Sequence, residues 1–467
     1  MKTFRPEVLY FVAALIILSG CSTIRPEKPV ESYGSVNYVL KPSVINIPIN
    51  IDIKNVETLL NTKINGLIYE DNSLEDNGGD NLMVKAWKKD KITIGYSNYQ
   101  LTYRVPLKLW IKIGFKISKF GLEVSDYREI NAEIALKYKT TVMLNKDWTV
   151  ASKTYSNGYE WISAPVMKVG PVDLNIKIIA DVILKTNKEK ITAAIDKGIK
   201  DYVNIRKYVS DSWQMVQKPY KVNDEYNVWL KITPLNIVTM PLSGTNNQLV
   251  LTLGIKGITE LHIGAMPDTV INRNLPPLNI VNKMDNNFLI NANIKVPFTL
   301  INDMTKKEIN GKTFTSGKQS VLIKDINIYG SDGCFIVDLS LLGSIKGNIY
   351  LKGTPYFDDS LKTIKVKDLD FDLKTKNVLL KSASWMLHHN LIKMIQPKLA
   401  YPVAKEYGEA KNAISEKLSN YQITDGIVLK GNLNDLQVDS MYINREAANI
   451  IISVDGTVKI EILKPVN

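Results

Sequence analysis

The sequence predicts an α+β protein of two tandem, elongated modules, each a long and highly curved antiparallel sheet wrapped along a long amphipathic helix. Three observations predict it: apolar residues alternate over unusual lengths, two stretches have helical apolar spacing, and one pattern occurs twice. The chain has 467 residues, 45% of them hydrophobic and 23% charged, which is the composition of a protein with buried cores.

The first 20 residues have the composition of an export signal. Basic residues precede an apolar stretch at residues 8–18, which is shorter than the roughly 20 residues a membrane-spanning helix needs. The stretch ends at Leu18-Ser19-Gly20-Cys21, which resembles the lipobox of bacterial lipoproteins. That resemblance implies that residues 1–20 are a lipoprotein signal peptide and that Cys21 becomes the acylated anchor. An ordinary secretory signal with an incidental cysteine is the alternative.

The residues after the anchor predict a tether and a location. Residues 21–35 carry prolines and mixed charges without apolar periodicity, so we expect them to link the membrane to the first module. Ser22 stands where inner-membrane retention usually shows aspartate, and no acidic run follows. Both features favour the outer membrane with the protein on its periplasmic face, and leave the cell surface open as an alternative.

The net charge and the small number of cysteines and histidines limit which kinds of partner and metal site we expect. The formal net charge of +12 favours anionic partners such as phospholipid or lipid A phosphates. We set nucleic acid aside, because an exported lipoprotein rarely meets it. Two cysteines and three histidines cannot build a disulfide framework or a Cys-rich zinc site. We therefore expect no metal and no cofactor.

The strands are predicted from alternation. From Leu101 to Ile117 every odd position is apolar, which indicates a strand with one dry face and about three times the usual 5 to 6 residues. Residues 172–184 alternate in the same way. Residues 335–351 also do, and Gly343 and Gly347 would let that strand bend.

The helices are predicted from apolar spacing of three and four. The first stripe consists of Ile191, Ile195, Ile199, Tyr202, Ile205, Val209, Trp213 and Val216. The second consists of Leu387, Leu391, Ile395, Leu399, Val403, Tyr407, Ala410, Ile414 and Leu418. Pro397 and Pro402 should kink or break this second helix.

An internal repeat divides the chain. Residues 49–66 match residues 294–311 without a gap at an offset of 245. At an offset of 199, residues 228–231 match residues 427–430, and the alternating positions 251, 253, 255 and 257 match 450, 452, 454 and 456. The first copy is therefore 46 residues longer in its middle. We expect a first module at residues 36–263, a linker rich in proline and asparagine at 264–287, and a second module at 288–467.

This organisation resembles the tubular lipid-binding fold, and two copies in tandem resemble bactericidal permeability-increasing protein and its lipid-transfer relatives. The chain from about Val36 onward is also similar to a family of uncharacterised Gram-negative lipoproteins. The second similarity depends on the segments 46–49, 67–71, 103–110 and 351–355. The resemblance implies an apolar groove for acyl chains in each module and carries over no ligand residue.

Helix residues facing the curved sheets are the candidate lining of such grooves. The candidates are Ile195, Ile199, Tyr202, Trp213, Leu391 and Ile395. Each of them could instead belong to an ordinary core. The adjacent pair His388-His389 cannot chelate one ion, because neighbouring helical residues point apart, and the aspartates at 368, 370 and 372 alternate as on a strand with one wet face.

Two function classes follow. The first is a non-catalytic envelope lipoprotein that binds or carries lipid or lipopolysaccharide acyl chains and is held on the membrane by its lipid anchor. The alternative is a structural or interaction lipoprotein that docks an envelope protein partner. An enzyme lacks support, because the sequence has no nucleophile elbow or zincin motif. Membrane-crossing strands would also alternate, but the two amphipathic helices and the anchor argue against them.

Overall fold

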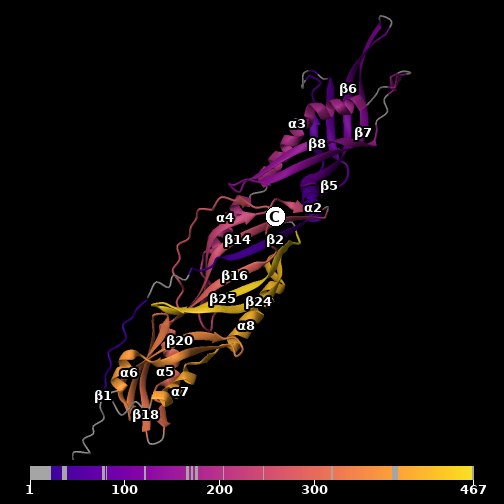
Figure 1. Cartoon of the computed structure of the whole chain (residues 1–467). Helices are drawn as coiled ribbons and strands as arrows, with labels where there is room; N and C mark the ends of the chain where they lie inside the picture. Colours follow the sequence, from indigo (N-terminus) through magenta and orange to yellow (C-terminus); the bar gives the residue numbers. More distant parts are fainter. Residues whose placement is uncertain are drawn as a thin grey trace, which may run out of the picture.

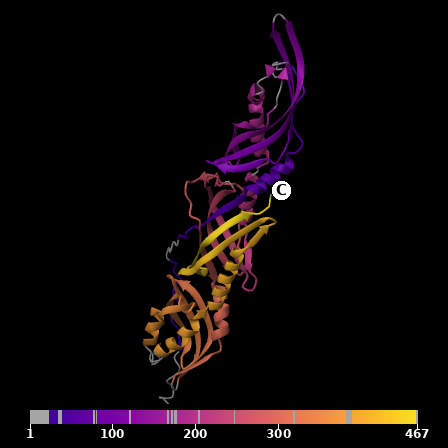
Figure 2. The same cartoon turned by 90° about the vertical axis from the view of Figure 1, so that its right-hand side faces the viewer.

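A computed structural model describes residues 23–33, 39–75, 79, 81–119, 122–164, 168–169, 172–173, 177–202, 205–245, 247–316, 319–380 and 388–464. The described chain is β-rich, with curled sheets arranged along an elongated molecule (Figures 1 and 2). A six-stranded sheet lies at one end, a ten-stranded sheet in the middle and a seven-stranded sheet at the other end.

The six-stranded sheet is built from the longest strands. It consists of β3 (Leu67–Asp71), β4 (Leu82–Lys88), β5 (Thr93–Ser97), β6 (Gln100–Lys119), β7 (Leu122–Leu144) and β8 (Val150–Ser163). Helix α3 (Lys177–Tyr202) lies along this sheet, preceded by the short strands β9 (Lys168–Val169) and β10 (Val172–Asp173) (Figure 1). We call this sheet, with α3 and helix α2 (Ile53–Lys63), the first end.

The ten-stranded central sheet takes strands from both halves of the sequence. Its members are β2 (Ser43–Asp52), β11 (Tyr220–Asn223), β12 (Val228–Thr239), β13 (Ser243–Gly244), β14 (Gln248–Ile263), β15 (Asn279–Ile280), β16 (Phe288–Pro297), β23 (Tyr421–Thr424), β24 (Ile427–Ile443) and β25 (Ala447–Ile462). Helix α4 (Ile205–Val216) and helix α8 (Ala404–Ser419) contact β12 and β24. Because one sheet joins both halves, the predicted boundary between the halves does not divide the central sheet.

The seven-stranded sheet forms the second end. It consists of β1 (Thr23–Ile24), β17 (Thr313–Ser316), β18 (Gln319–Ser331), β19 (Cys334–Gly343), β20 (Lys346–Asp358), β21 (Thr363–Phe371) and β22 (Tyr401–Pro402). Helices pack against it: α5 (Phe298–Ile309), α6 (Leu373–Leu380), α7 (His388–Ile395) and the 3-10 helix η2 (Gln396–Leu399).

The repeated sequences form equivalent elements. Strand β2 runs into α2 at Ile53, and 245 residues later β16 runs into α5 at Phe298; both of these side chains are buried. The bounds of β14, moved by 199 residues, are those of β25. The pairing repeats as well, since β14 lies antiparallel to β2 and β25 lies antiparallel to β16. The central sheet therefore has an approximate internal symmetry that follows the sequence repeat.

Several predicted elements are confirmed. The strand expected at residues 101–117 is β6, which has 20 residues and extends beyond the predicted strand at both ends. The second helix is broken where its prolines predicted, into α7, η2 and α8, because proline lacks the amide proton that a helix interior needs. The first helical stripe is divided between α3 and α4.

Two strand predictions were wrong. Residues 177–184, expected within a strand, begin α3. The apolar residues at 178, 180, 182 and 184 fit a strand, but those at 178, 179, 182 and 183 fit a helical face equally well, and apolar residues at helical spacing resume at Ile191. Residues 335–351 form the hairpin β19–β20 instead of one bent strand, with Leu341 opposite Gly347. Gly343 and Gly347, with φ angles of 108° and 122°, lie in the strands on either side of the turn at residues 344–345.

The expected linker and tether are both packed against the fold. In the 264–287 segment, Leu278 is 2% exposed, and the carbonyls of Asn272 and Pro276 accept hydrogen bonds from the indole Nε1 groups of Trp213 and Trp148. Residues 23–33 of the expected tether lie against the second end, where β1 pairs with β20. Buried apolar contacts and hydrogen bonds attach the described parts of both segments to the folded protein. Cys21 lies outside the described residues.

Candidate functional site

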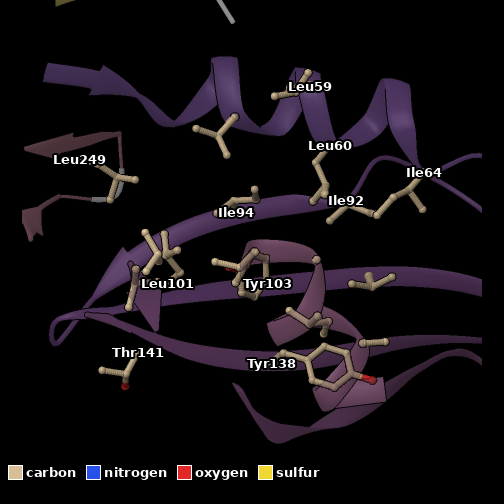
Figure 3. Close-up of a pocket in the computed structure, with 18 of the residues that line it drawn as sticks. Leu59, Leu60, Ile64, Ile92, Ile94, Leu101, Tyr103, Tyr138, Thr141 and Leu249 are labelled. Atoms are coloured by element: carbon tan, nitrogen blue, oxygen red, sulfur yellow. The ribbon is translucent and has the colours of Figure 1, made fainter. Parts of the chain in front are cut away.

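The first end contains a cavity of about 2240 Å³. Its walls come from α2, β4 to β7, α3 and the central sheet, and most of the side chains are aliphatic. Figure 3 shows Leu59 and Leu60 of α2 on one side, with Ile94, Tyr103 and Tyr138 on the strands across from them. The volume exceeds the roughly 300–1,000 Å³ of ordinary small-molecule pockets. The site therefore suits a large apolar ligand.

The long strands supply one wall because of their alternation. Leu101, Tyr103, Val105, Leu107, Leu109 and Ile111 of β6 all line the cavity. These are the odd positions that the sequence predicted to form a dry face. The facing strand β7 adds Ile134, Leu136 and Tyr138, which are buried with the β6 residues in one cluster. The regular period of the strands thus produces a continuous hydrocarbon surface.

Helix α3 closes the cavity and is held in place by a carboxylate. Ile191 and Ile195 pack against the apolar cluster of the six-stranded sheet. On the same helix, Asp196 accepts hydrogen bonds from Ser152 Oγ at 2.8 Å, from Thr154 Oγ1 at 2.7 Å and from the Thr154 backbone amide at 3.1 Å. These hydrogen bonds fix α3 to β8, while Ile195 on the same helix lines the cavity.

Few polar groups reach the cavity. Tyr138 is buried in the wall and Tyr103 is partly buried there, and desolvation raises the pKa of both hydroxyl groups above the ordinary value. They stay neutral at physiological pH. Thr140, which hydrogen-bonds to Tyr103, also contacts Thr154 Oγ1 at 2.8 Å. The polar groups of the wall are thus partly engaged with one another, and the surface offered to a ligand is mainly apolar.

The structure brings some predicted lining residues together and not others. Ile195 and Ile199 line the cavity. Trp213 does not: it is 4% exposed in a separate cluster with Trp148, Ile237 and Leu278. Tyr202 is the last residue of α3, and its side chain lies outside the described set.

The structure corrects the prediction that Leu391 and Ile395 line a groove. They are 1% and 0% exposed and belong to the core of the second end, packed with residues such as Leu339 and Ile349. The proline break divides the predicted helix into α7 and η2, and their apolar side chains pack into the core of this sheet. These two residues are therefore core residues of the second end.

Sequence reasoning missed the contribution of α2 and of the central sheet. Leu59, Leu60 and Ile64 close one side of the cavity, and Leu249 and Leu251 come from β14. Leu59 was visible as part of the repeated pattern, but nothing local indicated that this helix would face β5 and β6. Only the sheet topology brings these segments together.

Metal-binding clusters and membrane-spanning helices are two further features to consider in the described residues. No group of three or more histidine, cysteine or carboxylate side chains within the described ranges has a geometry that could hold a metal ion. In the same part of the chain, no helix combines the length and hydropathy of a membrane span.

Comparison with known proteins identifies the family. A family model described as "Domain of unknown function (DUF4403)" matches residues 41–462, so the chain belongs to that family. The expected membership of an uncharacterised family is confirmed. A search of curated proteins gives no match. Among solved structures, the chain is similar to "Crystal structure of lipopolysaccharide binding protein", with 10% identity, coverage of 91% of this chain and 100% of that chain, and a TM-score of 0.24. The cavity, and not this distant likeness, carries the functional argument.

Proposed function

We propose that this protein is a non-catalytic envelope lipoprotein that holds lipid acyl chains in the cavity of its first end. The observation that carries the proposal is the size and lining of the cavity: about 2240 Å³ bounded mainly by aliphatic side chains. Burial of hydrocarbon on such a wall is favourable by about 25 cal/mol per Å². A phospholipid or the acyl part of lipopolysaccharide has the required chemistry.

The proposal includes the anchor and the module organisation. Acylated Cys21 would hold the chain on the outer membrane, on its periplasmic face, since several acyl chains at about 0.8 kcal/mol per buried methylene give a permanent attachment. The two halves are proposed to be tandem tubular modules that share the central sheet, of which the first is hollow and binds lipid. The equivalent starts of α2 and α5 support that organisation.

Native mass spectrometry tests the binding. The Cys21→Ala variant, purified from its native host without detergent, should carry stoichiometric lipid that extraction releases as phospholipid or lipopolysaccharide. A chain that is always free of lipid, together with one dominant protein partner cross-linked in cells, would instead support the alternative structural role.

A matched pair of glycine variants locates the ligand. Gly198 lies within α3 on the cavity wall, and a Cβ there would meet nothing within 4 Å. In the Cys21→Ala background, Gly198→Trp should fill part of the cavity and lower the lipid occupancy at least several-fold. Gly408 also lies within a helix with open space at its Cβ, but it is not part of the wall. Gly408→Trp should therefore keep full occupancy, and equal losses in both variants would place the lipid elsewhere.

A further inference from the structure

Residues 23–33 form a docking strap on the second end. Strand β1 adds to the sheet as a parallel neighbour of β20, with Thr23 opposite Lys346 and Ile24 opposite Gly347. Ile24 is 2% exposed and belongs to the core of the seven-stranded sheet. A segment whose composition predicts a flexible linker is thus part of a folded core.

Hydrogen bonds continue the attachment along the strap. The backbone amide of Ser32 donates to Ser331 Oγ at 3.1 Å, and that hydroxyl donates to the carbonyl of Val30, also at 3.1 Å. The backbone amide of Asp332 donates to the carbonyl of Ser32 at 2.7 Å. Lys374 forms an ion pair with Glu27. Contacts at both ends of the segment therefore fix its path.

The sheet has a glycine where the strap passes. A Cβ at Gly347 would lie 1.9 Å from the carbonyl oxygen of Ile24, far inside van der Waals contact. The φ angle of 122° at Gly347 also requires glycine. The surface of β20 is therefore shaped to receive this segment of backbone.

The strap begins at the end of the molecule that is remote from the cavity. Figure 1 shows β1 beside the seven-stranded sheet, with the central sheet between it and the first end. Cys21 precedes Thr23 by two residues, so covalent geometry keeps it within about 7 Å of Thr23. An acyl anchor on Cys21 would hold this end of the molecule at the bilayer.

The charge around the start of the strap suits an anionic surface. Arg25 and Lys346 are exposed, and neither has an ion-pair partner among the described residues. The carboxylate of Glu27 is neutralised by Lys374. Cations beside an acyl chain provide the second signal that reinforces membrane attachment.

We propose that the docking strap orients the protein, so that the β19–β20 turn of the second end rests on the anionic surface of the anchoring membrane and the cavity is held away from it. The inference rests on the proposed anchor at Cys21. Lipid would then enter or leave the cavity at a distance from the anchoring bilayer surface.

Fluorescence quenching in vesicles tests the orientation. The acylated protein, carrying Cys334→Ser to remove the free thiol, is reconstituted into phosphatidylethanolamine and phosphatidylglycerol vesicles that contain a quencher lipid. One variant is labelled at Leu342→Cys beside the β19–β20 turn, and another at Tyr127→Cys on β7 of the first end; both side chains are exposed. Quenching should be several-fold stronger at position 342. Equal or stronger quenching at position 127 would overturn the inference.

Variants of the strap test its role. Gly347→Ala should displace Ile24 and reduce the difference in quenching between the two labels. Since Gly347 also has a φ angle that requires glycine beside the β19–β20 turn, Ser331→Ala provides a milder variant that removes two hydrogen bonds of the strap. An unchanged difference in both folded variants would contradict the role of the strap. The mass of the N-terminal peptide separates the two proposals: an unacylated Cys21 refutes the anchor, whereas an acylated chain with the wrong quenching order refutes only the orientation.

Discussion

The two ends of the molecule begin with the same strand-to-helix unit and are packed differently. At the first end, strands β6 and β7 have 20 and 23 residues, and the 26-residue helix α3 lies along them. At the second end, β18 and β19 have 13 and 10 residues, and the short helices α6 and α7 enter the curve of the sheet. In the part of the chain that the structure describes, the cavity lies between the larger sheet and α3, whereas α6 and α7 pack Leu379, Leu391 and Ile395 into the core of the smaller sheet. The longer strands and the long helix of the first copy are the elements that line the cavity.

The largest expected effect contrasts the two kinds of packing. Leu339 of the second end is completely buried. Leu339→Ala should lower the free energy of unfolding by about 2–5 kcal/mol, because it removes transfer energy and leaves a void. Ile195→Ala on the cavity wall should cost about 1 kcal/mol or less, since the existing cavity already lacks contacts there. Denaturant midpoints measure both, and similar costs would mean that the two ends are packed alike.

A second prediction concerns the fixing of α3 over the cavity. Asp196→Asn should lower the free energy of unfolding by about 1–3 kcal/mol, since three donors from Ser152 and Thr154 lose a charged acceptor. It should also speed the exchange of bound lipid, which a fluorescent fatty acid would report. The control is Asp201→Asn on the same helix, whose exposed pair with Lys197 contributes about 0–1 kcal/mol. Unchanged exchange in Asp196→Asn would show that α3 does not limit access.

The helix glycines give a smaller effect. Gly198→Ala and Gly408→Ala should each raise the free energy of unfolding by about 0.5–1 kcal/mol, because alanine loses less backbone entropy in a helix and neither Cβ meets an obstacle. Thermal unfolding measures the gain. A loss at Gly198 alone would indicate that the wall of the cavity is closer to α3 than this structure shows.

The smallest effect is a pH dependence at the second end. Hydrogen bonds from Lys365, and then from Ser360, lower the pKa of Asp358 to about 2. Because the folded pKa lies below the unfolded value of about 3.9, the contribution of Asp358 is present above pH 4 and is lost as the pH falls towards 2. Asp358→Asn should flatten the stability profile in that window, and an NMR titration that gives an ordinary pKa would contradict the contact.

Regular segments were predictable from the sequence because their signal is local. The dry face of β6 was visible in the alternation of residues 101–117, and the break after Ile395 was visible in Pro397. The start of α3 was not, since the apolar residues at 178–184 satisfy both periods. The hairpin at Gly343 and Gly347 was hidden because glycine fits a bent strand and a turn equally well. Within the candidate site, Ile195 and Ile199 were found, while Trp213, Leu391 and Ile395 proved to be core residues.

The sequence by itself determined the repeat, the apolar faces and the position of the helix break, because each depends on residues close together in the chain. Only the tertiary structure decided which apolar face borders a cavity and which is filled, since that depends on how far a sheet curves around its helix. It also decided the path of residues 23–33, whose attachment depends on Gly347 and Ser331, about 300 positions further along the chain. Packing between segments that are distant in the chain produces no repeating pattern of apolar residues, so it cannot be read from the sequence.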